Sequence, residues 1–167
     1  MIEERETMEA RIIEKQAFNV VGMTLETLLR DEREQRNIPK LFETFEQRIT
    51  EVKNRKNDHS IGIFIDPPNY NHETDKFRWI AGVEVLNGND IPDGMELYTF
   101  PANAYVCTTY KGPSDATYRA YDFLYKWVNE SEDYELADTY GIEQYLGSDE
   151  AGTQFMDLMF PVKIIKG

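Results

Sequence analysis

The chain has 167 residues, a formal net charge of −13 at pH 7 and 41% hydrophobic residues, which is typical of one soluble globular domain spanning 1–167. No apolar run approaches the roughly 20 residues that a membrane-spanning helix needs, and the charged start, Met1–Glu6, does not resemble a signal peptide. The acidic balance disfavours direct binding of nucleic acid, whose phosphates are bound by Lys and Arg. It favours cationic ligands or a basic protein surface, although an excess of acids can also serve solubility alone. We expect a cytoplasmic protein without a membrane segment.

The first predicted elements are strands. Met8–Lys15 alternates loosely between apolar and polar residues, and Ala17–Thr24 continues as a strand. The segment from Leu25 to Arg36 is rich in charge, and both a loop and the beginning of a helix fit it.

A helix is predicted from Ile38 onward, because Pro39 is favoured at the first helical position. Apolar residues then recur at spacings of three and four along one stripe: Ile38, Leu41, Phe45, Ile49 and Val52. The basic residues Lys53, Arg55 and Lys56 would favour the negative end of the helix dipole, so we expect them in the last turn.

Four strands are predicted in the middle of the chain. They cover Ile61–Ile65, Phe77–Leu86, Met95–Phe100 and Ala104–Tyr110, and turn residues separate them. In the longest of them, alternate positions share one face: Phe77, Trp79, Ala81, Val83 and Val85.

A second helix and two strands complete the chain. Gly112–Asp115 is predicted to cap a helix that extends to about Asn129. Its apolar stripe consists of Tyr121, Leu124, Tyr125 and Val128. Strands are expected at Tyr140–Leu146 and Gln154–Ile165.

The order of these elements is strand, helix, strand, strand, repeated once. We interpret it as two structurally similar halves, approximately 8–90 and 91–167, within a single domain. Hairpin-like links between the strands predict an α+β fold with an antiparallel sheet of about eight strands and both helices on one face.

Glu143 stands out because it lies within the aromatic and apolar strand Tyr140–Leu146. A carboxylate removed from water costs several kcal/mol unless a partner compensates it. Combined with aromatic rings, such an acid provides a countercharge and π faces for an organic cation. The alternative is that Glu143 faces solvent on an exposed strand face, and the local pattern leaves both possibilities open.

Motifs for other chemistry are scarce. His59 and His72 have no Cys or second His at metal-ligand spacing, and neither a nucleophile elbow nor a phosphate-binding glycine loop is present, so we expect no metal and no cofactor. The single cysteine, Cys107, lies in an apolar strand and is predicted to be an inert core thiol. The aromatic residues remain, and each taken singly is more often core than ligand site.

Taken together, an ordered set of motifs resembles the gyrase-inhibitor-like small-molecule-binding domain, also found as the effector-binding domain of AraC-type activators and MerR-type multidrug-responsive regulators. The matching segments run along most of the chain: Phe18–Gly22, Ile38–Phe45, Trp79–Val85, Pro92–Met95, Pro101–Val106, Tyr110–Pro113, Tyr121–Val128, Ile142–Tyr145 and Asp157–Val162. Two departures are Lys111, where a His is often seen, and the long segment from Leu25 to Arg36, which is a candidate lid.

The resemblance implies two pseudo-repeated halves and a ligand cleft, in which the acid at the Glu143 position meets the positive charge of lipophilic cations. The leading hypothesis is therefore a stand-alone binding protein for small amphipathic, preferably cationic aromatic, compounds. The candidate ligand-binding residues are Glu143, Tyr145, Tyr105, Trp79, Tyr110 and Phe42. Two alternatives remain: a hydrolase that opens reactive electrophiles with the same acid and tyrosines, and an acidic inhibitor of a DNA-associated protein such as gyrase.

Overall fold

The computed structural model describes residues 8–165, so the prediction made for Met1–Glu6 concerns residues outside this range. The strands are β1 (Arg11–Lys15), β2 (Phe18–Thr27), β3 (Arg55–Ile65), β4 (Phe77–Val85), β5 (Glu96–Phe100), β6 (Asn103–Gly112), β7 (Tyr134–Leu136), β8 (Tyr140–Ser148) and β9 (Gln154–Ile164). The helices are α1 (Leu29–Gln35), α2 (Asn37–Arg48) and α3 (Tyr118–Glu130), with 3-10 turns at Ile49–Glu51 and Ser114–Ala116. None of the described helices is long and apolar enough to cross a membrane.

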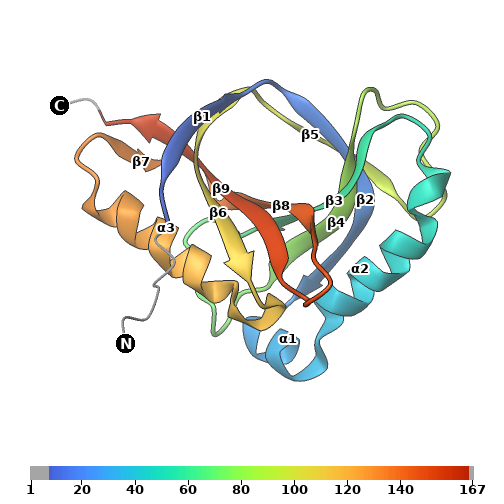
Figure 1. Cartoon of the computed structure of the whole chain (residues 1–167), viewed down its shortest axis with the longest axis horizontal. Helices are drawn as coiled ribbons and strands as arrows, with labels where there is room; N and C mark the ends of the chain where they lie inside the picture. The colour runs from blue at the N-terminus through green and yellow to red at the C-terminus, as the bar shows by residue number, and fades with distance from the viewer. Residues whose placement is uncertain (1–7, 166–167) are drawn as a thin grey trace.

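The strands form one antiparallel sheet in the order β1-β6-β9-β8-β3-β4-β2-β5, and the short β7 pairs with the end of β9. Figure 1 shows that this sheet curls into a half-barrel, with α2 and α3 along its outer side and α1 beside the entrance to α2. The predicted α+β class is confirmed, including an antiparallel sheet with the two main helices on the same face.

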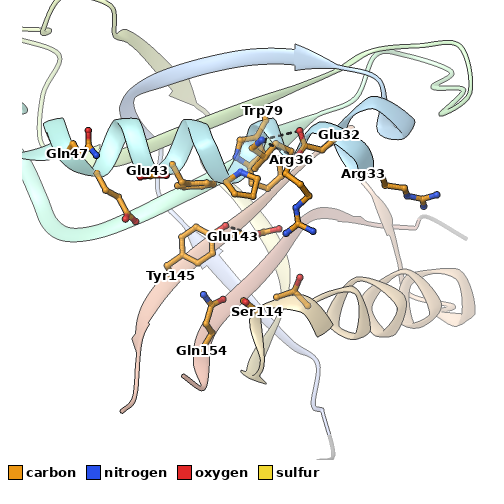
Figure 2. A pocket seen from close by; sticks show the side chains of 15 residues that line it. Glu32, Arg33, Arg36, Glu43, Gln47, Trp79, Ser114, Glu143, Tyr145 and Gln154 are labelled. Atoms are coloured by element: carbon orange, nitrogen blue, oxygen red, sulfur yellow. Dashed lines mark hydrogen bonds between the residues drawn. The ribbon is translucent and has the colours of Figure 1, made fainter. Parts of the chain in front are cut away.

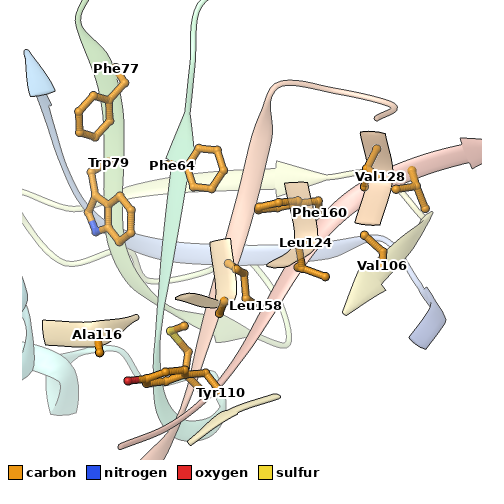
Figure 3. Close-up of a cluster of buried hydrophobic side chains, with 13 residues drawn as sticks. Phe64, Phe77, Trp79, Val106, Tyr110, Ala116, Leu124, Val128, Leu158 and Phe160 are labelled. Atoms are coloured by element: carbon orange, nitrogen blue, oxygen red, sulfur yellow. The ribbon is translucent and has the colours of Figure 1, made fainter. Parts of the chain in front are cut away.

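Both faces of the central strands are buried, because helices cover the outer face and the curl encloses the inner one. The enclosed face carries Ile63, Ile80, Tyr105 and Ile142, while the outer face packs against α3 through residues such as Phe160. Figure 3 shows this outer cluster, in which Leu124 and Val128 of α3 meet the side chains of the sheet. Cys107 lies in the enclosed cluster with 1% of its surface exposed, and burial raises the pKa of its thiol to about 12.

The prediction of one helix as far as Lys56 is wrong. Helix α2 ends at Arg48, and β3 already begins at Arg55, which pairs with Val85 of β4. The Arg55 guanidinium donates to the carbonyls of Ile49 and Val52, at 2.9 and 2.7 Å. The backbone of Arg55 therefore pairs with β4, while its side chain reaches back to carbonyls at the end of the helical segment without belonging to a helical turn.

Three further differences are local. The segment from Leu25 to Arg36, for which both a loop and the beginning of a helix fit the sequence, contains the end of a strand and a short helix. Strand β2 continues to Thr27, and α1 begins at Leu29. The residues expected to cap the second helix instead form a 3-10 turn at Ser114–Ala116, without a side-chain hydrogen bond to the start of α3. The sequence does not predict strand β7, because three residues are too few for an alternating pattern to be distinctive.

Candidate functional site

A cavity with a volume of about 870 Å³ lies between α1, α2, the segment before α3 and the central strands. This volume is within the range of sites for small organic molecules. Its walls combine aromatic, apolar, acidic and basic side chains: Glu32, Arg33, Arg36, Ile38, Pro39, Phe42, Glu43, Glu46, Gln47, Trp79, Ser114, Thr117, Glu143, Tyr145 and Gln154. Figure 2 shows these residues converging from the helices above and the strands below.

Glu143 occupies the strand side of this cavity and is buried, with 8% of its surface exposed. Its neighbour across the strands on one side is Gly62 of β3, and on the other Leu158 of β9. Because successive residues of a strand point to opposite faces, Ile142 enters the enclosed core while Glu143 points to the helix side. The central position of β8 in the sheet therefore takes this carboxyl group out of water.

Two tyrosine hydroxyls satisfy the Glu143 carboxyl group. Tyr145 donates to Oε1 at 2.5 Å, and Tyr121 of α3 donates to Oε2. Burial raises the pKa of Glu143, and the two hydrogen bonds, which favour the charged form, offset this only in part. Burial, followed by the nearby carboxylate, raises the pKa of both tyrosines well above the usual value, so they remain neutral donors.

Aromatic rings form the wall beside the carboxyl group. The Phe42 ring lies edge-on to Tyr145 at 5.2 Å and to Trp79 at 6.1 Å between ring centroids. The floor beneath them is Gly62, where an added Cβ would lie 2.6 Å from the Trp79 ring and 3.2 Å from the Tyr145 hydroxyl. The absence of a side chain at this position therefore leaves room for the rings.

The N–H group of the Trp79 indole is a buried hydrogen-bond donor. Its Nε1 is buried and has no hydrogen-bond partner among the described residues. Burying an N–H donor without a partner costs about 1–3 kcal/mol. Trp79 lines the cavity, so this unpaired donor belongs to a residue of the cavity wall, although the Nε1 atom itself is covered.

Of the six predicted ligand-binding residues, the structure brings four to the cavity: Glu143, Tyr145, Trp79 and Phe42. Tyr105 does not line it, because it points into the enclosed core, where its hydroxyl lies 2.8 Å from that of Tyr140. Tyr110 is also outside the cavity wall; it packs in the outer core and its hydroxyl donates to the Pro113 carbonyl at 2.6 Å.

Sequence reasoning did not select Tyr121 as a site residue, although it placed Tyr121 on the apolar stripe of the second helix. The i, i+3, i+4 pattern shows that a helical residue faces the sheet, but it does not show which strand residue it meets. A tyrosine on a buried stripe, where its hydroxyl needs a polar partner, is the one signal that could have found it.

No group of three or more His, Cys, Asp or Glu side chains within residues 8–165 is arranged to hold a metal ion. Lys111, which departs from the family pattern, is exposed and lies over the Phe155 ring, with 5.9 Å between Nζ and the ring centroid. Lys111 does not line the cavity.

Comparison with known proteins agrees with this architecture. The structure of SAV2435 bound to tetraphenylphosphonium superposes with a TM-score of 0.73 at 14% identity, and covers 93% of this chain and 94% of that chain. The EcmrR–DNA complex gives a TM-score of 0.71 at 17% identity, and covers 98% of this chain and 60% of EcmrR. These likenesses establish a shared fold.

A sequence relative is the transcriptional regulator BrlR of Pseudomonas aeruginosa, which is 32% identical over 119 residues, or 71% of this chain. The match spans only 41% of the length of that regulator. The family model of the GyrI-like small molecule binding domain matches residues 8–163, almost the whole chain. This chain therefore belongs to the GyrI-like small molecule binding domain family.

Proposed function

We propose that the chain binds amphipathic organic cations with aromatic groups, and that Glu143 supplies the countercharge. One observation carries this proposal. Glu143 is buried at the wall of a cavity of about 870 Å³, and among the described residues its carboxyl group is satisfied only by neutral hydroxyls, with no ion pair. A bound cation would provide the missing opposite charge in a dry site, where charge pairs are stronger than in water.

The aromatic wall supports the same class of ligand. A cation close to the face of Trp, Tyr or Phe gains about 0.5–2 kcal/mol from the ring quadrupole. Trp79, Phe42 and Tyr145 stand beside the carboxyl group, so one ligand can contact both charge and rings. That SAV2435 has been captured with tetraphenylphosphonium, a cation surrounded by four phenyl rings, is consistent with this proposal.

Isothermal calorimetry with tetraphenylphosphonium tests the role of Glu143. Glu143→Gln keeps the shape of the side chain and removes the charge, so we expect affinity to fall at least about tenfold, or 1.4 kcal/mol. Glu14→Gln, on the exposed part of β1, makes the same change in net charge and should bind like the wild type. Equal affinity in wild type and Glu143→Gln would refute the proposed countercharge.

Binding should also release protons. Because burial raises the pKa of Glu143, its carboxyl group stays neutral to a higher pH than that of an ordinary Glu, and a bound cation stabilises the ionised form. The binding enthalpy should therefore vary between buffers of different ionisation enthalpy in the wild type, and this variation should be smaller in Glu143→Gln. An equal buffer dependence of the binding enthalpy in both proteins would contradict proton release from Glu143 on binding.

A second candidate function is hydrolysis of a reactive electrophile, and the Tyr121–Glu143–Tyr145 arrangement favours it. The Glu143 carboxylate, made more basic by burial, can accept a proton from a water molecule that attacks an epoxide carbon, while the Tyr145 O–H donates a proton to the epoxide oxygen as the C–O bond breaks. Transfer of the proton from Glu143 to the Tyr145 oxygen then restores both groups. Incubation with styrene oxide, followed by mass spectrometry, distinguishes the two functions. A hydrolase yields the diol, whereas a binding protein returns the epoxide intact.

A further inference from the structure

The cavity carries a second charged feature, on the side opposite to the strands. Arg36 occupies the junction between α1 and α2 and adopts the left-handed conformation, with φ of 53°. Figure 2 shows its side chain extending from this junction into the space on the side of Glu143, whereas Arg33, which also lines the cavity, lies farther from Glu143. No ion pair joins either arginine to another residue within 8–165.

Glu32 accepts hydrogen bonds from the backbone at Arg36 and two residues after it. Its carbonyl accepts the Arg36 N–H at 2.8 Å, and its carboxylate accepts the Ile38 N–H at 3.0 Å. A left-handed conformation is uncommon for a residue other than glycine, so these bonds matter for keeping the junction in this form. The guanidinium is thus attached to a well-defined part of the cavity wall.

The acids near the entrance are partly engaged elsewhere. Glu32 accepts the Ile38 N–H at the start of α2, and Glu46 accepts a hydrogen bond from Ser60 at 3.3 Å. Glu43 lines the cavity and is exposed. Arg36 therefore presents an unpaired guanidinium to the cavity, opposite an unpaired buried acid.

From this arrangement we infer that the preferred ligand is amphoteric: an aromatic cation that also carries a carboxylate or similar anionic group. The cationic centre would lie against Glu143 and the aromatic wall, and the anionic group would meet Arg36, whose planar guanidinium matches a carboxylate. The inference rests on the proposed function and narrows it. It implies that Arg36 disfavours purely cationic molecules by charge repulsion and favours amphoteric ones.

Matched phosphonium probes test the inference. (4-Carboxyphenyl)triphenylphosphonium is amphoteric at neutral pH, and its methyl ester has nearly the same shape but is purely cationic. By calorimetry we expect the wild type to bind the acid at least as tightly as the ester, although the protein as a whole has a net charge of −13. Arg36→Gln should weaken binding of the acid by about fivefold and strengthen binding of the ester, because a partly exposed charge pair contributes about this much.

The opposite signs separate a ligand contact from a structural effect, which would change both affinities in the same direction. Arg30→Gln removes the same charge from α1 at an exposed residue that does not line the cavity, so both probes should change by less than about twofold. Arg36→Lys retains the charge and should restore most of the preference for the acid.

The possible failures are distinguishable. If the ester binds but the acid binds much more weakly to the wild type, or if Arg36→Gln shifts both probes alike, the inference about Arg36 is overturned while the proposed function stands. If neither probe binds to the wild type, the proposed function itself fails. The wild-type comparison of acid and ester applies even if Arg36→Gln does not fold.

Discussion

Glu84 and Glu143 are both buried acids of the same sheet, with 4% and 8% of their surfaces exposed, yet the protein treats them in opposite ways. Glu84 accepts from the ammonium groups of Lys15 at 2.8 Å and Lys56 at 2.9 Å. Burial alone would raise the pKa of Glu84, but the hydrogen bonds and charges of the two lysines outweigh it and lower the pKa. Glu143 has only tyrosine hydroxyls, and its pKa is raised.

The difference shows what each acid contributes. The charge of Glu84 is compensated by Lys15 and Lys56, and these ion pairs link β4 to β1 and β3. No uncompensated negative charge remains at Glu84 to attract a cationic ligand. Glu143 is hydrogen-bonded but not neutralised, and it faces a cavity. Burial of an acid is therefore insufficient to identify a site; the informative property is a buried acid without an internal cation.

The largest expected effect comes from breaking the compensated acid. Glu84→Gln leaves Lys15 and Lys56 close together without the charge between them, and we expect it to lower the free energy of unfolding by about 2 kcal/mol. Urea denaturation measures this change. Glu14→Gln, on the exposed face of β1, should change stability by less than about 0.5 kcal/mol, so equal stability of the two variants would show that the lysines do not depend on Glu84.

Two glycines of the central strands give the next largest effects and separate core from cavity. At Gly141 an added Cβ would lie 2.3 Å from the Phe64 ring in the outer core, and at Gly62 it would lie 2.6 Å from the Trp79 ring at the cavity. Gly141→Ala should cost about 1.5 kcal/mol of stability, and Gly62→Ala about 1 kcal/mol, because Trp79 can move into the cavity.

For ligand affinity we expect the opposite order, with the larger loss in Gly62→Ala. Displacing Trp79 narrows the cavity, so Gly62→Ala should weaken tetraphenylphosphonium binding by about tenfold, while Gly141→Ala, if folded, should change it little. Denaturation and calorimetry on both proteins provide the two readings. Equal loss of affinity in both would contradict the placement of the ligand beside Trp79.

The smallest effects are in the dependence of stability on pH, and they should have opposite signs for the two acids. The folded pKa of Glu143 is raised above its ordinary 4.5, so its contribution is fully present below that value and is lost as pH rises through the folded pKa. The folded pKa of Glu84 is lowered, so its contribution is present above 4.5 and is lost as pH falls through the folded pKa.

Relative to the wild type, Glu143→Gln should therefore gain stability as pH rises from about 4.5, and the deficit of Glu84→Gln should shrink as pH falls below that value. Urea denaturation of the three proteins from about pH 3 to pH 8 measures both trends. Taking differences from the wild type at each pH removes the titration of Asp66, whose pKa burial raises to about 6. Parallel curves for the three proteins would show that neither acid is perturbed.

Local pattern in the sequence was enough for the main elements of the fold. The apolar stripes from Ile38 and Tyr121 indicated the helices, and the runs around Phe77 and Phe160 indicated strands, because periodicity reflects which residues must leave water. The unusual acid in β8 could also be recognised, since Glu143 interrupts an otherwise aromatic and apolar strand.

The face of each strand, and therefore the composition of the site, depended on tertiary structure. Both faces of the central strands are buried, so alternation of polar and apolar residues, which normally identifies the core side, is missing in β6. Tyr105 and Tyr110 are five positions apart and point to opposite faces, one into the curl and one towards α3. Only the packed molecule determines that Tyr121, not either of these, reaches Glu143, because that contact joins residues from a helix and a strand whose alignment no local pattern encodes.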